Sequence, residues 1–135
     1  MARRALIAGV IAALCLPAAA AAAPPGGSLS LTLVSASDGQ LGPRTFFFTD
    51  TAYQGGKLVG SDRAVCRFTG NFENPRCKVT LSLPGGRLFA FLRLTPDPRG
   101  SFKVTGGTGM YEGKSGVGIY RSIGDTTTRI TIWLT

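Results

Sequence analysis

VTGGTGMYEGKSGVG, residues 104–118, decides the fold more than any other stretch of the sequence. It carries six glycines within residues 106–118, and strand-like segments lie on both sides of it. Glycine is used where the backbone takes a positive φ or where another backbone comes close, so this density predicts a tight corner or bulge. A pocket mouth is the alternative, because glycine turns also shape the rims of barrels. The expected structural positions are Gly106, Gly107, Gly109, Gly113 and Gly116.

The spacing of these glycines excludes two nucleotide-binding motifs. A phosphate-binding loop needs Gly, four residues and then Gly-Lys-Ser or Gly-Lys-Thr, but Thr108 stands five places before Gly113. A dinucleotide fingerprint would need a third glycine where the chain has Glu112. The stretch is therefore interpreted through backbone geometry.

Residues 1–23 have the pattern of a secretory signal peptide. Arg3 and Arg4 precede an apolar run that ends at Leu16, and an alanine tract follows. The run is too short to span a bilayer, so we expect no transmembrane segment in the mature protein. Residues 24–135 are expected to form one domain, secreted to the cell envelope, periplasm or extracellular space. The Ala-, Arg- and Gly-rich composition suggests a bacterial source.

The protein is basic, with a net charge of +8 from 15 Lys and Arg against 7 Asp and Glu. A basic balance permits contact with anionic envelope polymers or lipid head groups. Along the sequence the basic residues are spread singly, and no recognition helix or aromatic-rich RNA motif accompanies them. We therefore expect no nucleic-acid binding.

Cys66 and Cys77 are the only cysteines after the leader, and export would carry them into an oxidising compartment. Both lie in strand-like runs on either side of the turn-rich residues 69–76. A hairpin centred between Asn71 and Phe72 would place the two cysteines opposite each other, within disulfide reach. We expect a disulfide between them, and a reactive or ligand-contacting Cys66 thiol is the alternative.

Apolar and polar residues alternate with period two after the leader, and no helical periodicity appears there. We expect strands within residues 29–33, 44–49, 63–68, 77–83, 86–94, 101–105, 117–122 and 130–134, with a hairpin turn at residues 83–86. Eight short strands favour an all-β fold, an eight-stranded antiparallel closed barrel with one cross-strand disulfide.

The strand within residues 86–94 is apolar on both faces. Phe89 and Phe91 stand between Arg87 and Arg93 on what should be the outer face. Two explanations remain open: a subunit interface, in a dimer or trimer, or cover by the protein's own N-terminal segment.

The sequence contains no histidine. This excludes Ser-His-Asp and Cys-His nucleophile systems and His-ligated metal sites, and no calcium-loop pattern is present. We expect no metal and no cofactor. Most acidic residues lie beside Gly or Pro, which is typical of solvated turns. The candidate catalytic residues that remain are Asp50, Tyr111 and Glu112.

Several blocks resemble the allene oxide cyclase barrel family, including its small secreted bacterial members, and more distantly the plant dirigent proteins. The blocks are residues 46–53, 56–66, 77–86 and 104–118, and the GGTG-x-Tyr element at 106–111 is the most specific. The resemblance implies a calycin-type eight-stranded barrel around an apolar cavity, and often a trimer. It also makes Cys66 the counterpart of a pocket cysteine of the plant cyclases.

Other functional positions depart from these families. The pocket glutamate of the cyclases has no match around residues 35–38, and their tyrosine falls near residues 96–98. Ser115 replaces an arginine of the dirigent pattern. Asp50 is the best remaining acid at a barrel mouth, and the candidate ligand-binding residues are Phe46, Phe48 and Cys66.

The leading hypothesis is a secreted, disulfide-stapled barrel that binds a small apolar molecule and steers its cyclisation or coupling, which needs shape and water exclusion more than acid–base groups. The alternative is a non-enzymatic envelope-associated structural or interaction protein whose barrel is filled by side chains. A third hypothesis is an isomerase of the allene oxide cyclase type. The sequence leaves open whether the protein is an enzyme.

Overall fold

The computed structural model describes residues 27–70 and 73–135, so the expected leader lies outside the described residues. These residues form eight antiparallel strands and one short 3-10 helix, η1 (Gly109–Tyr111). The strands are β1 (Ser28–Gln40), β2 (Thr45–Gln54), β3 (Lys57–Thr69), β4 (Glu73–Leu83), β5 (Gly86–Arg93), β6 (Arg99–Gly107), β7 (Gly116–Ser122) and β8 (Thr127–Leu134). No helix in the described part of the chain is long and apolar enough to cross a membrane.

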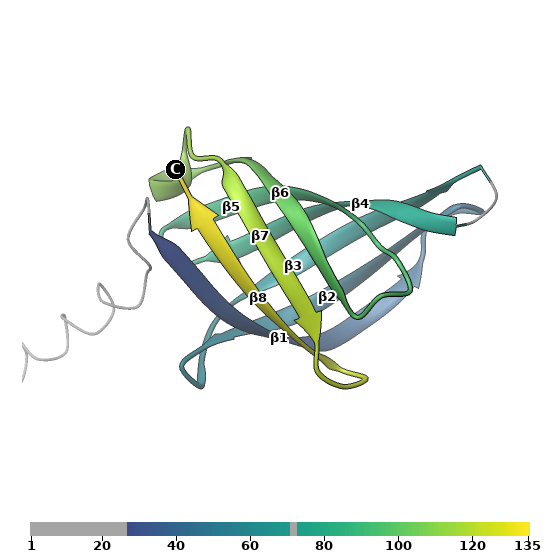
Figure 1. Cartoon of the computed structure of the whole chain (residues 1–135), viewed down its shortest axis with the longest axis horizontal. Helices are drawn as coiled ribbons and strands as arrows, with labels where there is room; N and C mark the ends of the chain where they lie inside the picture. The colour runs from purple at the N-terminus through teal and green to yellow at the C-terminus, as the bar shows by residue number, and fades with distance from the viewer. Residues whose placement is uncertain (1–26, 71–72) are drawn as a thin grey trace, which may run out of the picture.

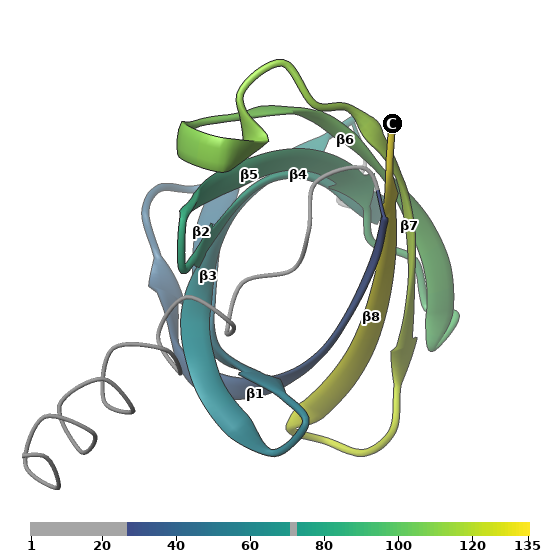
Figure 2. The ribbon, with the colours of Figure 1, turned by 90° about the vertical axis from the view of Figure 1, so that its left-hand side faces the viewer.

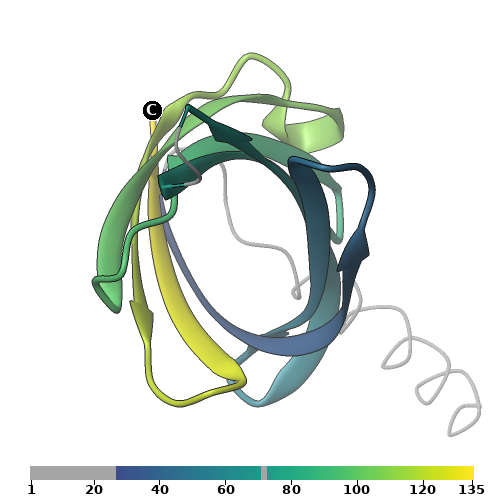
Figure 3. The same cartoon turned by 90° about the vertical axis from the view of Figure 1, so that its right-hand side faces the viewer.

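Each strand pairs with its neighbours in sequence, and β8 pairs with β1 to close the barrel (Figure 1). The closing ladder runs from Ser28 opposite Trp133 to Val34 opposite Thr127. Figure 2, which looks from the end that carries η1, and Figure 3, from the opposite end, both show a closed ring. The predicted eight-stranded antiparallel barrel is confirmed.

Period-two alternation places one face of every strand inside the ring. At the η1 end the interior is filled by a cluster of large side chains from β1, β8 and η1, among them Leu29, Leu134 and Tyr111. A second, smaller cluster lies around the two cysteines, with Phe46 and Phe48 packed against it. The barrel core is therefore divided into two unequal parts.

The predicted disulfide between Cys66 and Cys77 is confirmed. The two residues are direct cross-strand partners in β3 and β4, with their Cα atoms 4.0 Å apart. Both are fully buried on the inner face. Asn71 and Phe72, where the hairpin was expected to turn, lie outside the described residues.

Several strands extend beyond the ranges predicted from alternation. β1 continues to Gln40 through a run of mostly exposed polar residues, and a bulge lies between Ser35 and Ser37. Beyond Val34, β1 is paired with β2 while its ladder with β8 has ended. Backbone hydrogen bonds hold these residues in a strand although they bury little apolar surface, so alternation gave no signal for them.

The glycine-rich stretch forms the corner between β6 and β7, with η1 at its centre. Gly109 takes a positive φ of 62°. Gly107 lies so close to β5 that a Cβ atom there would overlap the carbonyl oxygen of Arg87 and the backbone of Tyr111. Gly106, next to it, has open space at the same position.

We predict that Gly107→Ala lowers the free energy of unfolding by at least about 2 kcal/mol, because the added methyl must displace backbone atoms. Gly106→Ala is the matched control and should be neutral or stabilising by about 0.5 kcal/mol, since alanine restricts the unfolded chain more than glycine does. Urea unfolding of both variants measures the difference. Equal stability of the two variants would contradict this account of the corner.

Candidate functional site

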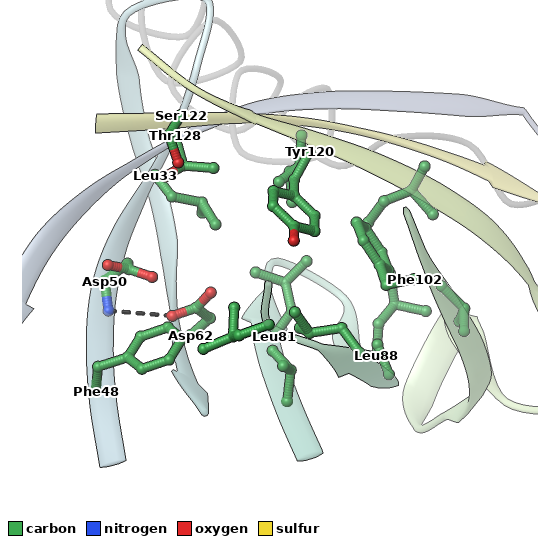
Figure 4. Close-up of a pocket in the computed structure, with 17 residues that line it drawn as sticks. Leu33, Phe48, Asp50, Asp62, Leu81, Leu88, Phe102, Tyr120, Ser122 and Thr128 are labelled. Carbon is green, nitrogen blue, oxygen red and sulfur yellow. Dashed lines mark hydrogen bonds between the residues drawn. The ribbon is translucent and has the colours of Figure 1, made fainter. Parts of the chain in front are cut away.

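A cavity of about 140 Å³ lies inside the barrel. Its wall is mostly apolar, and its polar atoms come from two carboxyl groups, one phenol and two hydroxyls (Figure 4). The lining residues are Leu33, Phe48, Asp50, Asp62, Val79, Leu81, Leu88, Ala90, Leu92, Leu94, Phe102, Val104, Tyr120, Ser122, Thr128, Ile130 and Ile132. None of the glycines of the β6–β7 corner lines it. The cavity is therefore separate from the stretch that identifies the fold.

Two carboxylic acids from neighbouring strands meet on the cavity wall. Asp50 in β2 and Asp62 in β3 are direct cross-strand partners, and both point inward. The backbone N–H of Asp50 donates a hydrogen bond to Oδ1 of Asp62 over 3.1 Å. Asp62 is only 6 % exposed. Figure 4 shows the two carboxyl groups side by side above the ring of Phe48.

The pKa of Asp62 is raised from 3.8 to about 8, mainly by burial and in smaller part by the charge and side-chain hydrogen bond of Asp50. The hydrogen bond from the Asp50 backbone opposes the rise because it favours the charged carboxylate. Desolvation dominates, since the carboxyl group leaves water for an apolar wall. Asp62 is therefore a neutral acid at pH 7, and the pair holds a proton inside the cavity.

Tyr120 in β7 points its hydroxyl into the cavity from another part of the wall (Figure 4). Its ring lies over Gly100, its cross-strand partner in β6, where a Cβ atom would overlap the phenol. The ring of Phe102 covers Gly118 of β7 in the same way. Burial raises the pKa of Tyr120, and the charge of Asp97 adds to the rise. The phenol is thus a hydrogen-bond donor across the cavity.

The candidate residues chosen from sequence fall into two groups. Asp50 and Phe48 line the cavity. Phe46 packs against the disulfide cluster, and the Cys66 sulfur is bonded to Cys77. The last two candidates lie at the corner and do not line the cavity: Tyr111 is fully buried in η1, and Glu112 is exposed just after it.

Burial raises the pKa of Tyr111, whose hydroxyl has no hydrogen-bond partner among the described residues. It belongs to the packed end of the barrel.

Sequence reasoning missed Asp62 and Tyr120. Asp62 alternates with Ala64 and Cys66 on the inner face of β3, so period-two alternation extended from Cys66 would have placed it inside. Its partnership with Asp50 depends on the register of the β2–β3 hairpin, which contains a bulge between Ala52 and Tyr53. Among the described residues no group of three or more His, Cys, Asp or Glu could hold a metal ion.

No protein-family model matches the chain, and no curated protein matches its sequence. Solved structures do match. A pyocyanin demethylase is 25% identical with a TM-score of 0.68, and the match covers 80% of this chain and 99% of that one. Two pterocarpan synthase dirigent proteins are each 14% identical with a TM-score of 0.58, and the matches cover 79% of this chain and 82% and 92% of theirs. The protein therefore has a dirigent-like barrel fold, whereas the likeness to allene oxide cyclases stays a prediction from sequence.

The raised pKa of Asp62 predicts a pH-dependent stability. Between about pH 4 and about pH 8 the unfolded chain releases the Asp62 proton while the folded chain keeps it. The free energy of unfolding should therefore fall as pH rises through this window and level off above it. Asp62→Asn, which cannot ionise, should flatten this dependence and be more stable than the parent protein above pH 7.

Urea midpoints measured across that pH range check this prediction. Asp125→Asn is the control, because Asp125 is exposed in the loop between β7 and β8 and should leave the slope unchanged. A slope that survives in Asp62→Asn would assign the dependence to another group.

Proposed function

We propose that this protein is a secreted barrel that binds a small apolar molecule carrying one hydrogen-bond acceptor, and that the Asp50–Asp62 pair holds a proton against that acceptor. The observation that carries the proposal is a neutral carboxylic acid on the wall of an otherwise apolar cavity. A site with few polar groups on a largely apolar surface is typical of small-molecule pockets.

The size of the cavity sets the size of the ligand. A buried apolar cavity of about 150 Å³ accommodates benzene, and the cavity here is about 140 Å³. One aromatic ring therefore fits, and the rest of a larger ligand would extend toward Ser122 and Thr128, at the ends of β7 and β8 away from η1. The leucines and isoleucines of the wall make apolar contacts that do not favour one orientation of the ligand. The orientation of the ligand therefore depends on hydrogen bonds to the carboxyl pair and Tyr120.

The chemistry supported best is general-acid steering of a conjugated ligand. A proton would pass from Asp62 to a carbonyl oxygen of the ligand, and the carboxylate left behind would keep the hydrogen bond from the Asp50 backbone. The apolar wall would exclude water from the activated ligand. Pyocyanin demethylase and pterocarpan synthase dirigent proteins are named for conversions of small organic molecules, which is consistent with this class of ligand. An isomerisation of the allene oxide cyclase type is the other chemistry that the same acid could serve.

The cavity favours this function over an envelope protein with a filled barrel. Packing at the η1 end and around the disulfide leaves a cavity between them, and the carboxyl pair lies on its wall, where a filled core would hold an apolar side chain. The disulfide supports secretion, because such bonds persist in oxidising compartments. A homo-oligomer, trimer or dimer, stays a prediction from the sequence.

Binding is tested with two ligands of nearly equal shape, cumene and acetophenone, of which only acetophenone has a carbonyl group. Both should raise the thermal unfolding midpoint. Below pH 8, where Asp62 is protonated, acetophenone should bind more tightly than cumene. Asp62→Asn keeps a hydrogen-bond donor and should retain part of the preference for acetophenone. Asp62→Leu should lose this preference, because its affinity for acetophenone should fall about 10-fold while its affinity for cumene stays the same.

Ala90→Leu fills the cavity and should abolish binding of both ligands, while Thr80→Leu on the outer face of β4 is the matched control. The binding function would be refuted if neither ligand raised the thermal unfolding midpoint and if phenols and pyocyanin also failed to raise it. Binding without a carbonyl preference would refute only the role of the acid.

A further inference from the structure

The ladder between β5 and β6 is short, and an external groove of about 410 Å³ lies where it ends. The last paired residues are Phe91 and Lys103, and β5 and β6 run on beyond them. The groove is lined by Arg76, Phe91, Leu92, Arg93, Ser101, Phe102, Lys103 and Val117. Leu92 and Phe102 line the internal cavity as well, so these two side chains separate the groove from the ligand site.

The groove and its surroundings carry an excess of positive charge. Arg67, Arg76 and Arg93 are consecutive cross-strand partners across β3, β4 and β5, and all three are exposed. Like charges placed directly opposite each other in a sheet are destabilising. Lys78 and Lys103, on either side of Phe91 in the next row, add two more exposed cations. Among the described residues no carboxylate lines the groove, so nothing in its lining offsets the repulsion.

Large apolar side chains stand among these cations. Phe91 is 46% exposed and Val117 is 56% exposed. The ammonium group of Lys78 lies 5.7 Å from the centre of the Phe91 ring. Exposed apolar side chains surrounded by Lys and Arg are the composition that binds the interface of an anionic bilayer: the cations meet the head groups, and the apolar tips enter between them.

We propose that this outer face of β4, β5, β6 and β7, centred on the groove, binds the surface of a membrane that contains anionic lipid. A second copy of the chain fits less well, because it has only 7 acidic residues and two of them, Asp50 and Asp62, face the barrel interior. A nucleic acid or polyanion would match the charges but would leave aliphatic Val117 without a partner. A bilayer satisfies both the cations and the apolar side chains. This inference does not depend on the proposed ligand function.

The test is co-sedimentation of the mature protein with vesicles of phosphatidylglycerol mixed with phosphatidylcholine, compared with vesicles of phosphatidylcholine alone. Each basic residue near an anionic surface contributes about five-fold to partitioning, so replacing Arg76, Arg93 and Lys103 by Gln should weaken binding about 100-fold. Replacing Lys57, Arg63 and Arg129 by Gln removes the same net charge from β3 and β8, outside the proposed face, and should have a much smaller effect. Far-ultraviolet circular dichroism checks that each variant is folded.

The apolar part is tested separately. Phe91→Thr combined with Val117→Thr keeps every charge and should weaken binding to the mixed vesicles at least about 10-fold. Binding of the parent protein should fall when salt is raised from about 0.1 M to about 1 M, where the Debye length shortens to about 3 Å.

Four results would overturn the proposal: equal binding to both kinds of vesicle, equal losses in the two charge variants, no effect of the apolar variant, or an oligomer that the apolar variant dissociates while vesicles do not bind. Tighter binding to an oligonucleotide than to vesicles, abolished by the groove variant, would assign the face to a polyanion instead.

Discussion

Hydrogen bonding between the first and the last strand is the constraint on which the rest of the structure depends. The β1–β8 ladder joins residues about a hundred positions apart in the sequence and leaves the barrel without a free edge. Closure also gives each strand an inside and an outside, so period-two alternation becomes a difference between an apolar interior and a wet surface. An open sheet of the same strands would expose Asp62 to water and would enclose no cavity.

Closure alone does not leave space, because eight-stranded barrels can be filled by side chains. Here the large residues gather at the η1 end, where the glycine corner brings Tyr111 onto the core beside Gly107. Toward the other end, the carboxyl pair and small Ala90 occupy the wall. The rings of Tyr120 and Phe102 lie over glycines of the adjacent strand. The unequal filling is what turns the interior into a cavity with an acid on its wall.

The distribution of charge follows from the same division. The two carboxyl groups of the cavity face inward, and burial holds Asp62 neutral. Neither carboxyl group therefore balances the arginines on the outer face of β3, β4 and β5. The barrel separates an acidic, apolar interior from a basic exterior, and Leu92 and Phe102 form the wall between them where β5 and β6 part.

The sequence by itself determined the strands, the closed barrel, the disulfide and two residues of the site, Asp50 and Phe48. Alternation is local, the cysteines lie symmetrically about a turn-rich segment, and Asp50 is the one acidic residue in its strand. It did not show that the corner with Tyr111 and Glu112 lies away from the cavity.

Tertiary structure alone decided the partnership of Asp50 with Asp62, the placement of Tyr120 and the groove between β5 and β6. The physical reason is that a pKa, a cavity and a cross-strand row of charges depend on register and desolvation. Register is set only when the strands pair, and desolvation arises only when the closed barrel encloses the side chains.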